Sequence, residues 1–220
     1  MAPEQGHASA GGVRRGRERN ADTRLQIFAA TEELLERVPL HDLSVAQIIE
    51  EAEISRATFY AYFSSKFDVV AGLLTKVTDD VYEVARLFIE RADDEPPDEA
   101  LQRALESTAR LWRTHRFALR AAVEHWNSVD ELRTIWLAAV ARFTEAIAGE
   151  IDRQRAAGIA PGGVDSRELT SALLWATERT LYVAGLDVGS PLAGEEQVVP
   201  VLYAVWRGAL YGAGAEIRFG

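Results

Sequence analysis

The chain has 220 residues, a formal net charge of −10 and 48% hydrophobic residues, which is the balance of a soluble globular protein with one or two domains. It contains no cysteine, which excludes disulfides, thiolate metal sites and cysteine nucleophiles. No apolar run approaches the roughly 20 residues of a membrane-spanning helix, and no signal-peptide core follows the N-terminal arginines. We therefore expect a cytoplasmic protein with no membrane partner.

Residues 1–21 are polar, rich in Gly, Ala and Arg, and lack helical periodicity, so we predict a disordered basic arm there. Five arginines lie between Arg14 and Arg24. They fit either a solvated tail or an arm that reaches a DNA groove or its phosphates. The acidic excess lies further along the chain. Residues 1–66 carry 8 basic and 10 acidic side chains, a net −2, whereas residues 67–220 carry 16 and 24, a net −8. Any DNA contact must therefore be a local basic surface.

Three short helices are predicted between residues 22 and 66. Apolar residues fall on one helical face over 23–38, and Pro39 ends that pattern. Ser44 and Gln47 form the sequence of a capping box at the start of a second helix. After a tight connection at 53–54, Ser55 is a good N-cap for a third helix that reaches Phe63. Two short helices joined by a tight turn indicate a helix-turn-helix domain over 22–66.

The third helix has the side chains that a major groove requires. Arg56 lies near its N-terminus, where arginine can pair bidentately with guanine, and Thr58 and Tyr60 can donate to phosphates. Lys66 lies at the N-terminus of the next helix, where the helix dipole disfavours a cation by about 0.3–1 kcal/mol. Solvent screening could tolerate that charge, but beside this motif we favour a phosphate contact.

The remainder, residues 67–220, also has helical patterns, and no segment alternates with period two. We predict helices at about 66–91, 98–113, 116–127, 130–157, 166–185 and 195–212. The chain is thus expected to be all-α with about nine helices: a three-helix DNA-binding domain followed by a larger effector-binding and dimerisation domain.

All five tryptophans lie in this second domain. Aromatic side chains such as Trp112 and Trp136 line cavities for apolar ligands, but they are also ordinary core residues, and composition leaves both interpretations open. Glu178 and Arg179 are adjacent in an apolar helix, and we interpret them as a structural pair or interface group rather than ligand contacts. The four histidines show no metal-ligand spacing and no nucleophile motif occurs, so we expect no enzyme, no metal and no cofactor.

The segment from Ser44 to Lys66 resembles the signature of TetR/AcrR-type transcriptional regulators, notably in Ile54-Ser55-Arg56, Thr58-Phe59-Tyr60, Tyr62-Phe63 and Ser65-Lys66. The resemblance implies DNA-facing roles, with Ser44 and Val45 near a phosphate, Arg56, Ala57 and Thr58 in the groove, and Tyr60, Tyr62 and Lys66 on the backbone; with the N-cap Ser55 these are the candidate DNA-binding residues. Family members usually have glycine where this chain has Glu53. If that turn needs a left-handed backbone, Glu53 costs roughly 1 kcal/mol relative to glycine.

Residues 178–182 and 205–212, with 131–144, resemble the EthR-like subgroup of this family, whose helical domain holds a long apolar tunnel. The resemblance implies a small apolar effector and, with Trp112 and Trp136, the lining residues Leu137, Val140, Phe143, Thr144, Leu174, Thr177, Tyr182 and Trp206. It also implies a homodimer formed by the last two helices, including a stripe over Leu169, Leu173, Thr177 and Leu181. We expect a repressor that leaves a roughly palindromic operator when the effector binds. The alternatives are a ligand-responsive activator and a helical protein-interaction module without DNA binding.

Overall fold

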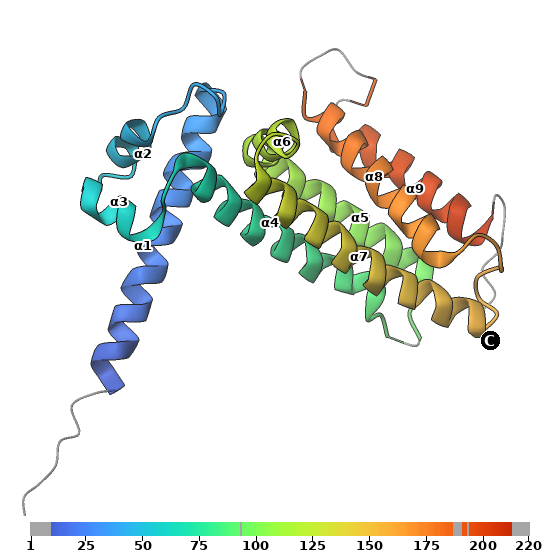
Figure 1. The fold of residues 1–220 in the computed structure, drawn as a ribbon. Coiled ribbons are helices and arrows are strands. Elements are labelled where there is room, and N and C mark those ends of the chain that lie inside the picture. Colours follow the sequence, from blue (N-terminus) through green and yellow to red (C-terminus); the bar gives the residue numbers. More distant parts are fainter. Residues whose placement is uncertain (1–9, 93, 187–190, 193, 213–220) are drawn as a thin grey trace, which may run out of the picture. The chain divides into compact units, whose positions relative to one another are not determined.

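The computed structural model describes residues 10–92, 94–186, 191–192 and 194–212, with the backbone alone at 10–19 and 195. Those residues form nine helices and no strand, which confirms the all-α prediction (Figure 1). The chain divides into two compact units, Met1–Val70 and Ala71–Gly220. None of the helices in the described part is long and apolar enough to cross a bilayer.

The N-terminal unit consists of α1 (Ala10–Arg37), α2 (Val45–Glu51), α3 (Arg56–Tyr62) and the start of α4 (Lys66–Ile89). The predicted caps are present. Ser44 and Gln47 make both bonds of the capping box, and the Ser55 hydroxyl accepts from the Thr58 backbone N–H at 3.0 Å. Because each of α2 and α3 spans only 7 residues, these caps and the burial of apolar side chains stabilise helices that would be marginal alone. Their shared core includes the side chains of Ile27, Leu34, Leu43, Ile48, Phe59, Phe63 and Val69.

The turn between α2 and α3 has left-handed backbone at Glu53, with a φ of 50°. The Ile54 N–H donates to the Ile49 carbonyl at 3.2 Å, and the Glu53 N–H donates to the Glu50 carbonyl at 3.1 Å. These two bonds define a Schellman motif, whose left-handed position glycine usually occupies. The side-chain amide of Gln26 on α1 donates to the Ala52 carbonyl at 2.7 Å and braces the same turn. Glu53 therefore adopts the backbone that makes a non-glycine residue costly.

One predicted boundary differs from the structure. We expected a disordered arm through residue 21, but α1 begins at Ala10. Residues 10–21 contain alanine, arginine and glutamate, which have high helix propensity even without an amphipathic pattern, and they continue directly into the amphipathic part of the helix. Residues 1–9 of the expected arm lie outside the described part.

The C-terminal unit contains most of α4 and five further helices: α5 (Pro97–Thr114), α6 (Arg116–His125), α7 (Asp130–Ala156), α8 (Ser166–Ala184) and α9 (Glu195–Tyr211). Each begins and ends within two residues of its predicted bounds. Sequence signals explain the starts, since Pro97 occupies the first turn of α5 and Asp165 accepts from two backbone N–H groups of α8. Within this unit α7 lies beside α8, and α9 packs against both α5 and α8 (Figure 1).

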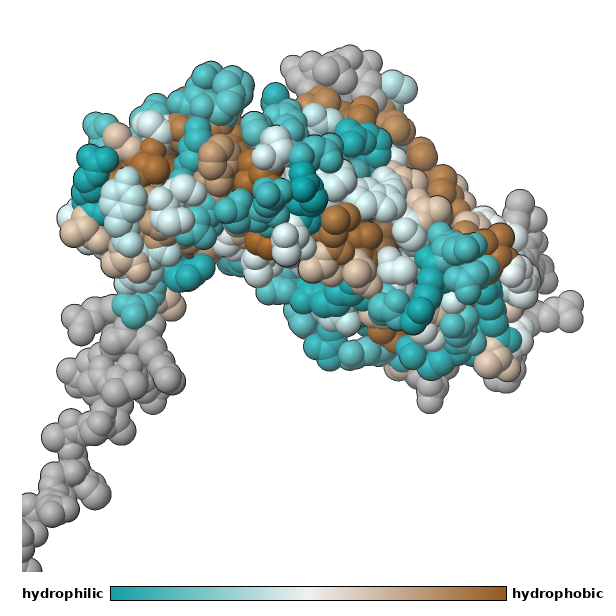
Figure 2. Space-filling model, viewed as in Figure 1, coloured by the Kyte–Doolittle hydropathy of each residue, from teal (hydrophilic) through white to brown (hydrophobic). Residues whose placement is uncertain are grey.

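The core of the C-terminal unit is formed by facing apolar stripes. On α5 the buried positions follow a 3–4 spacing from Ala100 to Ala109. Facing them are Phe143 and Ile147 of α7, Leu173 and Leu181 of α8, and Leu202 and Trp206 of α9. Leu173, Thr177 and Leu181 are thus buried within the unit, which corrects our assignment of their stripe to a dimer surface. Hydrophobic surface remains visible beside α8 and α9 in the space-filling view (Figure 2). On α9, Val201 and Val205 are 42% and 46% accessible.

Candidate DNA-binding and ligand-binding sites

The exposed face of α3 carries the residues predicted to read DNA. Ser55, Arg56, Ala57 and Tyr60 are exposed, whereas Phe59 on the opposite face is fully buried. The Arg56 guanidinium lies 5.8 Å from the centroid of the Tyr60 ring, a cation–π distance that holds the arginine along the helix surface. The helix therefore has an apolar back and a cationic, hydroxyl-rich front.

Hydrogen bonds already engage part of this front. The hydroxyls of Ser55 and Thr58 lie 2.8 Å apart, and Thr58 is half-buried. The Tyr62 hydroxyl donates to the Asn20 side chain on α1 at 2.7 Å. Ser44 is exposed and Val45 half-buried at the start of α2. Arg56 and Tyr60 are thus the exposed long side chains of the predicted set.

The Lys66 side chain bonds to backbone groups within the protein, which the sequence did not reveal. Its ammonium group donates to the carbonyls of Leu40, His41 and Leu43, at 2.8, 2.9 and 2.7 Å. An ammonium has three N–H donors, so three carbonyls of the α1–α2 connection use all of them. The sequence suggests a phosphate beside Lys66 because an anion there would offset the unfavourable interaction of the ammonium with the helix dipole. The three carbonyl oxygens already supply that compensation.

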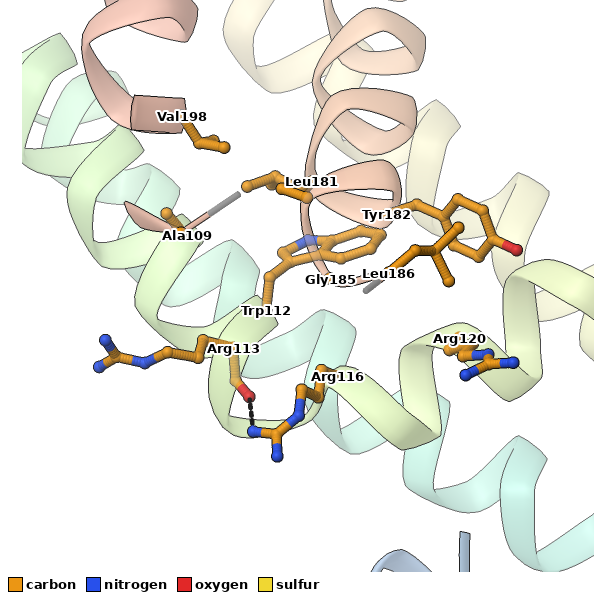
Figure 3. A pocket seen from close by; sticks show the side chains of 12 residues that line it. Ala109, Trp112, Arg113, Arg116, Arg120, Leu181, Tyr182, Gly185, Leu186 and Val198 are labelled. Carbon is orange, nitrogen blue, oxygen red and sulfur yellow. Dashed lines mark hydrogen bonds between the residues drawn. The ribbon is translucent and has the colours of Figure 1, made fainter. Parts of the chain in front are cut away.

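Described residues of the C-terminal unit line apolar cavities, and three of these border residues of the predicted ligand site. The first, about 190 Å³, has Ala109 and Trp112 of α5 on one side and Leu181, Tyr182 and Gly185 on the other (Figure 3). We call it the arginine-rimmed cavity because Arg113, Arg116 and Arg120 also border it. In Figure 3 the guanidinium groups of Arg113 and Arg116 turn away from the Trp112 indole. Arg120 pairs with Glu124 at 2.9 Å, and Glu124 also accepts from the Tyr182 hydroxyl at 3.2 Å.

The other two cavities adjoin each other. The Glu178 cavity, about 100 Å³, is lined by residues of five helices, from α4 to α8, and shares Trp112 with the arginine-rimmed cavity. The Trp206 cavity, about 70 Å³, shares with it Val81, Thr108, Phe143, Leu174 and Thr177. The Trp206 indole N–H donates to the Thr177 hydroxyl at 2.8 Å, so that polar pair is satisfied inside the apolar wall.

The Glu178 cavity contains two polar side chains that are not fully satisfied. Oε1 of Glu178 and Nε1 of Trp136 are buried and have no hydrogen-bond partner among the described residues. The other oxygen of Glu178 lies 3.9 Å from Nε of Arg179. Burial raises the pKa of the Glu178 carboxyl, and the charge of Arg179 opposes that shift only in part. Glu178 thus borders the cavity as well as lying beside Arg179, whereas the sequence predicts a structural pair or interface group.

Most residues predicted to line a ligand site border one of these cavities: Trp112, Trp136, Val140, Phe143, Leu174, Thr177, Tyr182 and Trp206. Two do not. Leu137 is 44% exposed and Thr144 is half-buried, and neither lines any of the three cavities. On α7, Trp136, Val140 and Phe143 follow the 3–4 spacing of one helical face, whereas Leu137 and Thr144 lie seven residues apart on the neighbouring stripe. The resemblance alone did not separate these two stripes.

Several lining residues were missed. Val77, Thr78 and Val81 bring α4 into the wall of the Glu178 cavity, and Leu119 does so for α6. In sequence these positions look like an ordinary apolar face, and nothing in the pattern distinguishes a residue that borders a void from one that fills the core. Within the described part no cluster of His, Asp or Glu side chains suited to a metal ion was found.

Comparisons with known proteins agree with this geometry. Residues 27–73 match the family model for the N-terminal domain of bacterial regulatory proteins of the TetR family, and residues 101–212 match the C-terminal domain of the transcriptional regulator EthR. The chain is 30% identical to the HTH-type transcriptional regulator EthR of Mycobacterium tuberculosis over 201 residues, which cover 91% of this chain and 93% of that one. The EthR protein of Mycolicibacterium smegmatis is also 30% identical, over 91% and 92% of the two chains.

Solved structures share the fold at lower identity. FadR, the fatty acid degradation regulator of Bacillus halodurans, superposes with a TM-score of 0.71 at 16% identity, over 89% of this chain and 97% of that one. FadR of Bacillus subtilis, solved in complex with stearoyl-CoA, gives a TM-score of 0.69 at 19% identity, over 86% and 98%. The helix-turn-helix, the family matches and the near full-length similarity lead to one conclusion: this chain belongs to the TetR family of DNA-binding transcriptional regulators, in its EthR-like branch.

Proposed function

We propose that the chain acts in the cytoplasm as a homodimeric repressor, which binds a roughly palindromic operator and leaves it when a small apolar ligand enters the C-terminal unit. The observation that carries this proposal is the continuity of α4. The helix begins at Lys66, whose ammonium group fastens the α1–α2 connection of the DNA-binding unit. Three turns later, Val77, Thr78 and Val81 line the Glu178 cavity. A ligand that moves these later turns also acts on the first turn, because both belong to one helix.

Reading of DNA is assigned to α3. In a two-fold dimer, two copies of α3 enter major grooves about one helical turn, or 34–36 Å, apart. Arg56 reads a guanine, Ala57 and Thr58 face the groove, and Ser44, Val45, Ser55, Tyr60 and Tyr62 contact or approach the backbone. The exposed valines of α9, Val201 and Val205, provide apolar surface for the dimer.

The ligand acts by shifting a population. One form of the dimer holds the two α3 helices at the spacing of the DNA grooves, and another form holds them at a different spacing. A compound that binds the second form more tightly lowers the DNA affinity by the ratio of its affinities for the two forms. Trp112, Trp136, Val140, Phe143, Leu174, Thr177, Tyr182 and Trp206 form the apolar walls that it contacts. The stearoyl-CoA bound to FadR of Bacillus subtilis supports a ligand with a long hydrocarbon part as one class to test.

The test begins with selection of bound sequences from random duplexes, which we expect to yield an inverted repeat. Arg56→Ala then weakens binding to the selected duplex by roughly 1–3 kcal/mol, about 5- to 150-fold, through the lost guanine contact. Arg110→Ala, which removes another exposed arginine, in the C-terminal unit, serves as the matched control and leaves the affinity unchanged. Equal affinities of the wild type and Arg56→Ala would refute the assignment of α3. A chain that selects no duplex at all would instead be the protein-interaction module.

A promoter-reporter assay separates the repressor from an activator of the same fold. Deleting the gene raises expression from the selected operator if the chain represses. A fall in expression on deletion would support the activator.

A further inference from the structure

Glu178 differs from every other residue that lines its cavity, because it is the one acidic side chain in an otherwise apolar or neutral wall. Its side chain is 11% exposed and its Oε1 has no hydrogen-bond partner among the described residues. A buried polar atom without a partner costs about 1–3 kcal/mol, and more when it carries charge. Such a group is retained at a cost to stability, which suggests that it has a role in binding.

The charge of Arg179 does not satisfy the Glu178 carboxyl. Arg179 lies at 3.9 Å, beyond hydrogen-bond distance, and its side chain is 59% exposed to solvent. The terminal torsion of a glutamate is broad, so a small rotation of the carboxyl group turns an oxygen towards the cavity. Trp136, in the same wall, adds an indole N–H that also has no partner. The cavity therefore combines apolar surface with an acceptor and a donor for the polar group of a ligand.

The charges beside the arginine-rimmed cavity have the opposite sign from the charge beside the Glu178 cavity, so the two cavities favour different ligands. Its arginines would attract an anionic group, but Arg113 and Arg116 turn outward and Arg120 is paired with Glu124 (Figure 3). In the Glu178 cavity, by contrast, the charged group lies in the wall itself. A carboxylate or phosphate entering there would face a like charge, whereas an amine would find an acceptor.

We propose that the Glu178 cavity binds an apolar amine, whose nitrogen donates a hydrogen bond to the Glu178 carboxyl. This rests on the proposed function, since it names the chemical class of the effector. The apolar part lies against Val77, Trp136 and Phe143, and the ammonium group makes a charge-assisted bond, about twice as strong as a neutral one. An acceptor atom on the same molecule is satisfied by the Trp136 indole N–H.

The test uses three compounds with the same chain and different head groups: n-octylamine, n-octanol and octanoate. Calorimetric titration of the purified full chain at pH 7.5 and 150 mM salt is expected to show that octylamine binds at least tenfold more tightly than octanol. Octanoate is expected to bind most weakly. Glu178→Gln lowers the affinity for octylamine at least tenfold and leaves that for octanol within threefold, because it removes the charge and keeps the shape.

Two controls keep the result interpretable. Glu168→Gln, at an exposed position of the same helix, changes neither affinity, which excludes general attraction of amines to an acidic protein. The melting temperature of Glu178→Gln without ligand is at least that of the wild type, since burial of an unpaired carboxyl is relieved, so weaker binding cannot be ascribed to unfolding.

Three outcomes would overturn the proposal: no preference for the amine, an amine affinity that Glu178→Gln leaves unchanged, or tightest binding of octanoate. The last would point to the arginine-rimmed cavity. A different result would contradict the proposed function itself: no apolar compound, whatever its head group, releases the protein from the operator. Release by octanol as readily as by octylamine would overturn only the role of Glu178.

Discussion

In the DNA-binding unit, Gln26, Ser55 and Lys66 bond to backbone groups of neighbouring turns. In the C-terminal unit, by contrast, five buried side-chain atoms have no hydrogen-bond partner among the described residues. They belong to Arg91, Trp136, Arg155, Thr170 and Glu178. The first unit holds two 7-residue helices in a fixed arrangement, which groove recognition requires. The second retains space and unused hydrogen-bonding groups, which a protein that responds to a ligand can employ.

The contrast is not one of general packing quality. At one end of the C-terminal unit, Gln154 is buried, donates to Glu150 at 2.7 Å and accepts from the Tyr211 hydroxyl at 2.8 Å. Burial raises the pKa of Tyr211, so this hydroxyl stays protonated, and remains a donor, at alkaline pH where an exposed tyrosine would ionise. The same unit therefore contains a polar network between α7 and α9 that is joined by hydrogen bonds, and a cavity whose polar atoms are not.

The largest expected effect tests the fixed arrangement of the DNA-binding unit. Lys66→Ala removes three charge-assisted bonds to loop carbonyls, and we expect a loss of about 2–3 kcal/mol in the free energy of unfolding, allowing for partial exposure. DNA affinity falls with it, because the α1–α2 connection loosens. Urea unfolding measures the first effect, and fluorescence anisotropy with labelled operator measures the second.

The salt dependence of binding shows which role of Lys66 dominates. If Lys66 has only a structural role, Lys66→Ala and the wild type show the same slope when the logarithm of DNA affinity is plotted against the logarithm of salt concentration. A slope smaller in magnitude by about 1, with unchanged stability, is what loss of a phosphate contact produces. That second result would restore the phosphate contact that the sequence suggests, and the DNA-binding unit would then also hold a polar group that is kept free for a partner.

A substitution of intermediate expected effect tests whether the Glu178 cavity of the C-terminal unit can be filled. Val140→Phe projects a larger side chain into the Glu178 cavity, and we expect a gain of about 1 kcal/mol in unfolding free energy from added apolar burial. It also weakens any ligand of this cavity at least tenfold. Leu137→Phe, three positions earlier on α7 and on the exposed stripe, is the control and changes neither quantity. Destabilisation by Val140→Phe with intact ligand binding would mean that the void is not available to a guest.

The smallest effect concerns the turn at Glu53. Its φ of 50° favours glycine, so Glu53→Gly is expected to stabilise the chain by up to about 1 kcal/mol, less the entropy that glycine adds to the unfolded state. Thermal unfolding should show a rise of up to roughly 4 °C. DNA affinity stays within twofold of the wild type, because the Schellman bonds are backbone bonds. A fall in melting temperature would mean that the Glu53 side chain contributes more than its backbone costs.

Local signals made most of the fold predictable. The capping box at Ser44, the N-cap at Ser55 and the proline at 97 each mark a helix start through bonds or angles of nearby residues, and the structure contains all three. The extension of α1 to Ala10 was missed, since propensity without periodicity gives no clear signal.

The sites were less predictable because they depend on contacts distant in sequence. Lys66 meets carbonyls 23–26 residues away, and only the folded chain shows that its donors are used. Leu137 and Val140 are both apolar residues of one helix, yet one is exposed and the other lines a cavity. Glu178 looked like half of an ion pair because the sequence shows its neighbour Arg179 and not the void beside it.

The arrangement of the indole rings provides an optical readout that needs no label. Trp112 and Trp136 stand edge to face, with centroids 6.5 Å apart, and both border the Glu178 cavity. Trp126 and Trp175 stack at 6.0 Å and line none of the three cavities. A guest in the Glu178 cavity changes the surroundings of the first pair and leaves those of the second. Trp206 is hydrogen-bonded to Thr177 of the same wall, so the change in intrinsic fluorescence of the native chain sums the responses of the first pair and Trp206.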